Sequence, residues 1–366
     1  MTFLSATTAY ERWLGKHLTL VPHDLAAKHE AMSRQFFPFF RATYYRWAQL
    51  WPEVCGKLKD APRTLSAGDL HIENFGTWRD IEGRLIWGVN DFDETWPLPY
   101  TNDLVRLAAS SQITGGVCKT KDACEAILEG YLNALKQGGR PYVLAEDHLA
   151  LRHLATERLK DPGNFWRKLA TQREHAGAMP KIVAKGLDRM MPERDLPCRY
   201  INRVAGLGSL GRVRIAAVSD WHGAKIAREA KALAPSACAW AMGRKGTPRI
   251  RYEEILETAV RCPDPFVRQR GNWIFRRLAP DCSRIELQDL PEERDEIRLL
   301  HAMGWETANV HLGNAKARDL LKDVQSRGAK WLHPAASAMV KRLAADWEEW
   351  RAAYAPASGA AAAPSS

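Results

Sequence analysis

Two short segments of the chain hold residue types whose spacing is typical of phosphoryl transfer. In Gly68–Asn74, an aspartate, Asp69, is followed by four residues and then by an asparagine, Asn74. In phosphotransferase catalytic loops this aspartate accepts or orients a hydroxyl proton, and the asparagine binds a metal ion. The second segment, Asp91–Glu94, begins seventeen residues after Asn74. We therefore expect Asp69 to be catalytic.

A predicted hairpin connects these two acidic segments. Residues 74–79 and 85–89 are rich in apolar side chains, and a Glu-Gly pair at 82–83 supplies the turn. The hairpin would return the chain to the first segment and gather carboxylate and amide oxygens around one point.

Such an oxygen-rich cluster suits Mg²⁺, which prefers hard oxygen ligands. We expect Asn74 and Asp91 to bind Mg²⁺, and Asp93 to be a candidate ligand of a second ion. The alternative is that Asp69 and Asn74 cap a turn and that residues 91–94 form an acidic loop.

A glycine-rich segment, Gly206–Gly211, lies between two β-type runs at 198–204 and 213–218. Protein kinases cover nucleotide phosphates with a strand, a glycine loop and a second strand. Glycine allows backbone amides to approach phosphate oxygens. A dinucleotide-binding fold would follow the glycines with a helix, and a hairpin turn without a ligand is the other alternative. The residues expected to cover the β- and γ-phosphates of ATP are Gly206, Gly208, Ser209 and Gly211.

The third strand of such a unit, predicted at 224–230, should carry a cation for the phosphates. Lys225 and Arg228 are the candidates, and Lys231 is a weaker third. Lys225 and Arg228 are three positions apart, so in a regular strand they point to opposite faces and only one can face the nucleotide. The sequence leaves the choice between them open.

Aromatic and arginine residues alternate between residues 26 and 51. This pattern could bind single-stranded nucleic acid by stacking. A buried helix pair with arginines at its rim explains the apolar spacing better. Pro38 is expected to break or kink this run.

Two further segments carry polar residues near predicted helix ends. Asp103 follows an extended 96–100 segment and is expected to cap the helix that begins there. Asn309 and His311 could reach a site, although a helix that ends at Gly313 explains the segment about as well.

The composition limits partners and compartment. Lys and Arg number 53 against 43 Asp and Glu, a formal net charge of +10. Such a balance favours anionic partners or is dispersed over solvated faces. The seven cysteines form no C-x-x-C pair, and neither a signal-peptide pattern nor a membrane-spanning apolar run occurs. We expect a cytoplasmic protein without membrane contact. An anionic acceptor is plausible, and the sequence does not indicate an oligomeric state.

The two acidic motifs resemble those of the aminoglycoside and choline kinases. These carry a Gly-Asp-Leu-His…Asn loop, as at 68–74, and then a hydrophobic strand that ends in an Asp-Phe-Asp-like metal site, as at 89–93. The chain resembles more closely the bacterial family called domain of unknown function 2252. The matching segments lie between about residues 30 and 290: 32–41, 68–76, 90–95 with 103–110, and 206–212 with 228–230.

The resemblance implies a kinase-like fold joined in circularly permuted order, because the glycine segment follows Asp69 instead of preceding it. It also places Arg228 where the family has a lysine. The expected fold is α+β and two-lobed. Its helical catalytic lobe is 1–195 with 291–354, its β-rich nucleotide-binding lobe is 196–290, and 355–366 is a disordered tail.

The expected function is transfer of the ATP γ-phosphoryl group to a hydroxyl of a small molecule or protein, with Mg²⁺. The alternatives are a nucleotide-binding protein without turnover, acting as a regulatory or scaffold module, and a nucleic-acid-binding protein.

Overall fold

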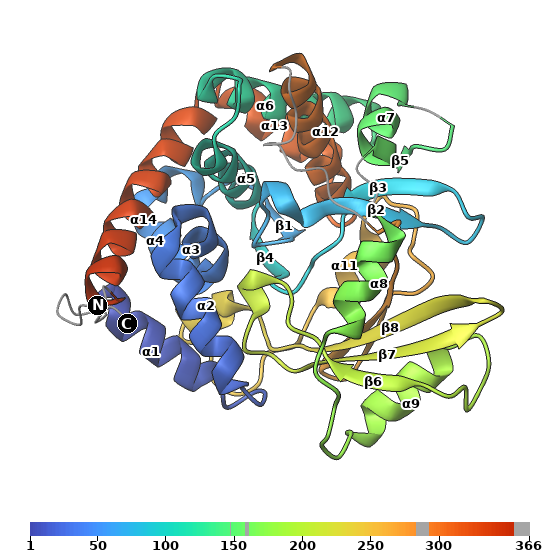
Figure 1. Ribbon diagram of the computed structural model, residues 1–366. Coiled ribbons are helices and arrows are strands. Elements are labelled where there is room, and N and C mark those ends of the chain that lie inside the picture. The colour runs from blue at the N-terminus through green and yellow to red at the C-terminus, as the bar shows by residue number, and fades with distance from the viewer. Residues whose placement is uncertain (147, 158–160, 283–292, 355–366) are drawn as a thin grey trace, which may run out of the picture.

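The chain folds into a mixed α+β structure that is mostly helical and contains antiparallel sheets (Figure 1). This computed structural model describes residues 1–146, 148–157, 161–282 and 293–354. The helices are α1 (Phe3–Leu14), α2 (Pro22–Arg34), α3 (Phe36–Ala42), α4 (Tyr44–Val54), α5 (Thr101–Thr114), α6 (Thr120–Gln137), α7 (Leu149–Glu157), α8 (Pro162–Ala170), α9 (Lys181–Met190), α10 (Ala237–Ala241), α11 (Tyr252–Thr258), α12 (Glu293–Leu312), α13 (Ala317–Ser326) and α14 (Leu332–Tyr354), with 3₁₀ turns η1 (Gly56–Leu58), η2 (Ile72–Asn74) and η3 (Leu207–Ser209).

The strands form three sheets. They are β1 (Arg63–Ser66), β2 (Phe75–Arg79), β3 (Leu85–Val89), β4 (Trp96–Pro99), β5 (Tyr142–Val143), β6 (Arg199–Asn202), β7 (Arg214–Trp221), β8 (Ala224–Ala232), β9 (Arg268–Arg270) and β10 (Trp273–Leu278). One sheet has the order β6-β7-β8-β10-β9, the second β2-β3-β5 and the third β1-β4. All these pairings are antiparallel.

The predicted hairpin between the acidic segments is confirmed. β2 pairs with β3 in a register that places Phe75 opposite Val89, and Gly83 in the connecting turn has φ of +74°. The two strands are almost wholly buried, since aromatic and β-branched side chains pack on both faces. The hairpin therefore fixes where the second acidic segment begins.

The strands around the glycine-rich segment are also confirmed, with shifted ends. β7 runs to Trp221, beyond the predicted 213–218, and β8 runs to Ala232, beyond the predicted 224–230. A tight turn at His222-Gly223 joins them, and both residues have positive φ. This sheet lies within 196–290, the range expected to form the β-rich lobe, and the division into lobes stays a prediction.

The aromatic segment at 26–51 forms part of the core. The break expected near Pro38 lies at Gln35, and Pro38 sits in the first turn of α3, where a missing N–H costs little. Its fully or nearly buried aromatic residues are Phe39, Phe40, Tyr44, Tyr45, Trp47 and Trp51. The explanation as a core face, which the apolar spacing favours, agrees with this burial.

Asp103 does not cap its own helix, contrary to the expectation. α5 begins after Tyr100, and Asp103 lies inside its first turn, fully buried. Its carboxylate accepts the backbone N–H groups of Ala67 at 2.8 Å and Gly68 at 3.0 Å, and contacts His311 Nε2 at 3.2 Å. The Asp103 carboxylate therefore binds the backbone of the loop that precedes Asp69. A buried carboxylate needs hydrogen-bond donors, and this loop supplies them.

Gly68 meets a steric requirement in that loop. Its φ is +79°, and a Cβ there would lie 2.4 Å from the carbonyl oxygen of Glu94. Only glycine therefore allows the two acidic segments to approach so closely.

The helices of residues 293–354 close the structure around the first half of the chain. α12 packs on α6 and α14 packs on α5. The end of α14 lies beside the start of α1, where the Glu349 carboxylate accepts the N–H groups of Phe3 and Leu4 (Figure 1). Residues 283–287, whose β-type pattern predicts a strand, and the tail expected at 355–366 lie outside the described residues.

Within the described part of the chain, no helix combines the length and apolar character needed to cross a membrane. The seven cysteines are free, in agreement with the absence of a disulfide pattern in the sequence.

Candidate active site

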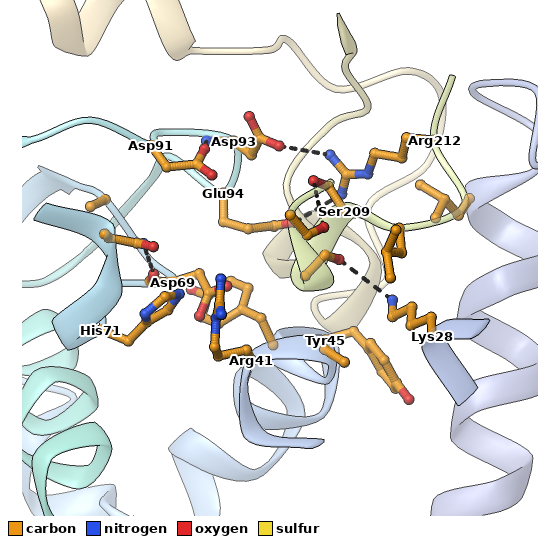
Figure 2. A pocket seen from close by; sticks show the side chains of 18 of the residues that line it. Lys28, Arg41, Tyr45, Asp69, His71, Asp91, Asp93, Glu94, Ser209 and Arg212 are labelled. Atoms are coloured by element: carbon orange, nitrogen blue, oxygen red, sulfur yellow. Dashed lines mark hydrogen bonds and ion pairs between the residues drawn. The ribbon is translucent and has the colours of Figure 1, made fainter. Parts of the chain in front are cut away.

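The two acidic segments and the glycine-rich segment line one pocket (Figure 2). Asp69, Asn74 and Asp91 face Gly206, Gly208 and Ser209 across it. The approach is close, because a Cβ on Gly208 would lie 3.8 Å from Asp69 Oδ2 and 3.1 Å from the Arg41 carbonyl oxygen. Regions separated by more than a hundred residues thus meet as expected.

Asp69 is held by an arginine from α5. Arg106 Nη2 and Nε donate to the same oxygen, Asp69 Oδ1, at 2.6 and 3.0 Å. Arg106 is fully buried and stacks on Phe40, with its guanidinium carbon 3.6 Å from the ring centre. Both bonds use Oδ1, and Oδ2 lies on the side of Gly208. Burial raises the pKa of Asp69, and the charge of Arg106 opposes this effect.

Asn74 is oriented by the loop that carries Asp69. Its Nδ2 donates to the backbone carbonyl of Asp69, and the side chain is buried at the end of η2, directly before β2. Because the amide nitrogen is engaged by this bond, the amide oxygen is the atom that remains to meet a cation.

Asp91 is the most accessible of the acidic groups. Its side chain is 34% exposed, and its Oδ1 accepts the backbone N–H of Asp93 at 3.3 Å. Burial alone would raise its pKa, but the charges of Lys231 and Arg276 lower it. Asp91 therefore remains ionised and keeps carboxylate surface open to the pocket.

Asp93 is enclosed by two cations. Lys231 Nζ donates to both of its oxygens at 2.6 and 2.7 Å, and Arg212 Nη1 lies 3.3 Å from Oδ2. Lys231 Nζ also lies 3.6 Å from Asp91 Oδ1. Asp93 thus anchors β8 to the second acidic segment, and its expected role as a second-metal ligand stays a prediction.

The structure places Lys231 beside the acidic segments, not Lys225 or Arg228. Lys225 lies near the β7–β8 turn, half-exposed, and binds Asp220 at 2.8 Å. Arg228 faces the other side of the sheet, where it donates to the Met190 carbonyl and stacks on Phe266. Lys225 and Lys231 share a strand face but are six residues apart, about 20 Å along a strand. Of the three candidate cations, Lys231 is therefore the one that contacts the acidic segments, and which of them binds phosphate stays a prediction.

One of the four glycine-loop residues lies outside the pocket. Gly206, Gly208 and Ser209 line it, whereas Gly211 packs against Leu25 and its carbonyl accepts the N–H of Val21. Gly211 has φ of +92° and turns the chain into β7, so its position has a structural explanation.

A larger cavity of about 580 Å³ adjoins the pocket, and the two share Asp91 and Gly206 in their linings. The described residues that line it include two aspartates, Asp91 and Asp264, and the arginines Arg203, Arg214, Arg261, Arg276 and Arg277. Aromatic rings also line this cavity: Trp78, Phe92, Phe165 and Tyr252. Positive charge therefore exceeds negative charge on its walls, and flat apolar faces are present.

Three of these arginines are held by one buried carboxylate. Arg203, Arg214 and Arg276 all contact Glu229, which is fully buried on β8. Burial alone would raise the pKa of Glu229, but the three arginines lower it strongly. One carboxylate thus orients three guanidinium groups and neutralises only part of their charge.

The pocket supplies few protein oxygens for Mg²⁺. The described residues contain no group of three or more His, Cys, Asp or Glu side chains placed so that they could hold a metal ion by themselves. Asp91 and Asn74 do offer one carboxylate and one amide oxygen in a shared pocket. Mg²⁺ is commonly bound by one or two protein oxygens, with substrate phosphates and waters as the other ligands. The residues therefore fit Mg²⁺ that arrives with a phosphate ligand.

A family of known sequences matches the part of the chain that carries the two acidic segments. Residues 20–192 match a family described as an uncharacterized protein conserved in bacteria, DUF2252. The match confirms the family resemblance for both acidic segments, and it ends before the glycine-rich segment. No curated protein and no solved structure matches the chain.

Several residues of the site were not found from the sequence. Arg106 and Lys28 lie within the matched residues 20–192, and Arg212 and Glu229 lie beyond them. A signal exists for one of them, because Arg106 is a charged residue within the apolar run 104–109 of α5. A charge in such a run is buried and needs a partner. Nothing in the sequence indicates which partner it finds.

Proposed function

We propose that the protein is a Mg²⁺-dependent phosphotransferase that moves the γ-phosphoryl group of ATP to a hydroxyl of an acceptor. The observation that carries this proposal is the shared pocket. Asp69, Asn74 and Asp91 lie opposite a glycine-rich loop and next to an arginine-lined cavity. These are the parts that phosphoryl transfer uses: a hydroxyl-positioning carboxylate, metal ligands and a phosphate cover.

The arginine-lined cavity is the proposed nucleotide site. Its aromatic walls offer faces for a base, and its excess of arginines suits a triphosphate. Since Asp91 and Gly206 border both spaces, the terminal phosphate would lie at the junction of the cavity and the pocket. Lys231 lies on β8, the third strand of this sheet in chain order, and kinases carry their phosphate-binding lysine on a third strand, which supports the proposal.

In the proposed reaction, each of the pocket side chains has a separate role. Asp69 Oδ1 is fixed by Arg106, so Oδ2 accepts the acceptor hydroxyl proton as the oxygen attacks the γ-phosphorus. The product nucleotide leaves as ADP. Asn74 and Asp91 would hold Mg²⁺, which neutralises developing charge on the phosphates. Catalysis of this kind depends on positioning and electrostatics, and the buried ion pairs supply both.

A kinase-like, circularly permuted fold is part of the same proposal. In the five-stranded sheet the glycine loop joins the first and second strands, and the lysine lies on the third. This order supports the kinase-like arrangement in which a β-sheet covers the nucleotide. The family match does not extend to this sheet.

A nucleotide-binding protein without turnover is the alternative that Arg228 suggested. Arg228 lies away from both acidic segments, on the face of β8 that packs against Phe266 and Met190. Because Lys231 has the position next to Asp91 and Asp93, an arginine at 228 gives no reason to expect lost turnover. We therefore favour the enzyme.

Binding and turnover can be tested separately. Calorimetry should detect Mg²⁺-dependent ATP binding, and Asp91→Asn should weaken it about tenfold or more, because a metal ligand is lost. Asp220→Asn, which removes an exposed carboxylate paired with Lys225, is the matched control and should bind normally. ATP depletion with pooled metabolites then tests turnover. Equal binding by wild type and Asp91→Asn, or no binding at all, contradicts the proposal.

A further inference from the structure

Lys28 is a buried lysine that the proposed transfer chemistry does not use. It lies on α2 with 5% of its surface exposed, and its Nζ points into the pocket toward the glycine loop (Figure 2). No carboxylate of the described residues lies within ion-pair distance of it. Within the described residues, its Nζ donates to the Gly208 carbonyl oxygen at 3.5 Å. An ammonium group buried without a counter-ion is costly, so its presence calls for an explanation.

Two arginines of the same pocket also have N–H groups without a hydrogen-bond acceptor among the described residues. Arg41 contacts Glu73, and Arg212 contacts Asp93 and Glu94. Even so, the Nε atoms of both arginines are buried and have no hydrogen-bond partner within the described part of the chain. The wall formed by α2, α3 and the glycine loop therefore offers more donors than the protein itself satisfies.

We propose that Lys28 binds a small anionic group, a phosphate or a carboxylate, of the acceptor. The acceptor is then an anionic hydroxyl compound. This inference rests on the proposed function, because the acceptor site is defined by Asp69. Lys28 and Asp69 line the same narrow pocket of about 50 Å³, whereas Lys28 does not line the arginine-rich cavity. That volume admits a few waters or one small group.

The placement also separates the acceptor anion from the nucleotide. The proposed triphosphate approaches through the cavity on the Asp91 side, past the arginines held by Glu229. Lys28 reaches the pocket from α2, and the backbone of Gly208 lies beside its ammonium group. A hydroxyl carried by the bound compound could then face Asp69 while its anion is held at Lys28.

Labelling of individual lysines tests the site directly. The full-length protein is dimethylated with formaldehyde and cyanoborohydride, with inorganic phosphate or with chloride at equal ionic strength, and each lysine is quantified by mass spectrometry. We expect phosphate to reduce labelling of Lys28 about tenfold, as a charge-assisted contact implies. Labelling of the exposed Lys59 should not change. Equal labelling of Lys28 in both salts overturns the proposal.

Repeating the labelling with a nucleotide shows whether the anion at Lys28 comes from the acceptor or from the nucleotide. Mg²⁺ with a non-hydrolysable ATP analogue, without free phosphate, should leave Lys28 labelling within about twofold. If the analogue protects Lys28 as strongly as phosphate does, the anion is a nucleotide phosphate and the acceptor assignment is wrong. If the analogue does not bind but phosphate still protects Lys28, the proposed function fails and the anion site stands.

Lys28→Met separates a binding role from a structural one. A structural lysine would lower the melting temperature when removed. An unpaired buried charge retained for binding should give an equal or higher melting temperature, because an apolar side chain of similar length replaces it. The variant should also lose any phosphate-induced rise in melting temperature that depends on this site. A lower melting temperature in chloride, together with an undiminished response to phosphate, overturns the proposal.

Discussion

Asp69 keeps one carboxylate oxygen toward the pocket because Arg106 engages the other. Arg106 also donates to the Phe40 carbonyl at 2.8 Å, so its guanidinium is fixed from α3 as well as from the acidic loop. The result is a carboxylate with a defined orientation and a pKa raised by burial against the opposing charge of Arg106. Both features suit a group that receives a proton from a hydroxyl.

Asp69→Asn should therefore reduce turnover without preventing nucleotide binding. The amide cannot take up the hydroxyl proton, and loss of such a group costs on the order of 10²- to 10⁴-fold in rate. Affinity for Mg²⁺–ATP should remain within about threefold, because the proposed metal ligands are Asn74 and Asp91. Steady-state rates and calorimetry on one preparation measure both. Unchanged turnover would remove Asp69 from the mechanism.

Replacing Lys231 and replacing Lys225 should have different effects on stability and on nucleotide binding. Lys231→Met leaves Asp93 buried beside only one cation, and broken buried pairs cost about 3–5 kcal/mol of unfolding free energy. Lys225→Met removes a surface pair with Asp220, worth no more than about 1 kcal/mol. Urea unfolding measures both variants. Nucleotide affinity should fall in Lys231→Met alone, and equal losses would contradict the position argued for Lys231.

Among the elements, α12 determines how β3 presents the second acidic segment. Glu306 on α12 accepts the backbone N–H of Val89 at 3.3 Å and the side-chain amide of Asn309 at 2.7 Å. A Cβ on Gly88 would lie 2.3 Å from Glu306 Oε1, so the helix and the strand are in direct contact. Burial raises the pKa of Glu306 to about 7, against opposing hydrogen bonds and the charge of Arg261.

This raised pKa predicts a pH dependence of stability. The native state binds the Glu306 proton more tightly than the unfolded chain does, so the associated stability is present at low pH and is lost as pH rises from about 4.5 to about 7. Glu306→Gln should remove that part of the slope, at most on the order of 3 kcal/mol. Unfolding free energies from pH 4 to 8 measure it.

Glu53→Gln, which changes an exposed carboxylate of α4, is the control and should keep the wild-type slope. If Glu306→Gln also keeps it, Glu306 does not titrate in this range and the burial argument fails.

The sequence predicted elements better than it predicted partners. The β2–β3 hairpin and the strands around the glycine loop follow from local patterns of apolar residues and turn glycines. The contact of Arg106 with Asp69, and the use of Asp103 by the loop at 67–68, join residues 35–37 positions apart. Lys231 meets Asp93 across 138 positions. Such pairings depend on tertiary packing, which no local pattern encodes.

At the scale of the whole molecule, buried ion pairs join the five-stranded sheet to the acidic segments. Lys231 binds Asp93, and Arg212 binds both Asp93 and Glu94. Burial raises the pKa of Glu94 to about 7, although the charge of Arg212 opposes this effect. The two parts of the site are therefore linked through a shared set of charges, and a change on one side alters the electrostatics of the other.

Because α1 and α14 are in contact, the two ends of the described chain lie close together and could be joined in a circularly permuted variant. Phe3 lies against Trp350, with ring centres 5.6 Å apart, and residues 192–195 form an exposed turn before β6. Joining residue 366 to Met1 and opening the chain within that turn would yield a protein in which the glycine-loop sheet precedes the acidic loops and the chain ends after α9. Because the packing is preserved, we expect this rearranged polypeptide to fold and to bind Mg²⁺–ATP with wild-type affinity. Calorimetry would measure that affinity, and a folded product unable to bind would show that the native chain order matters to the site itself.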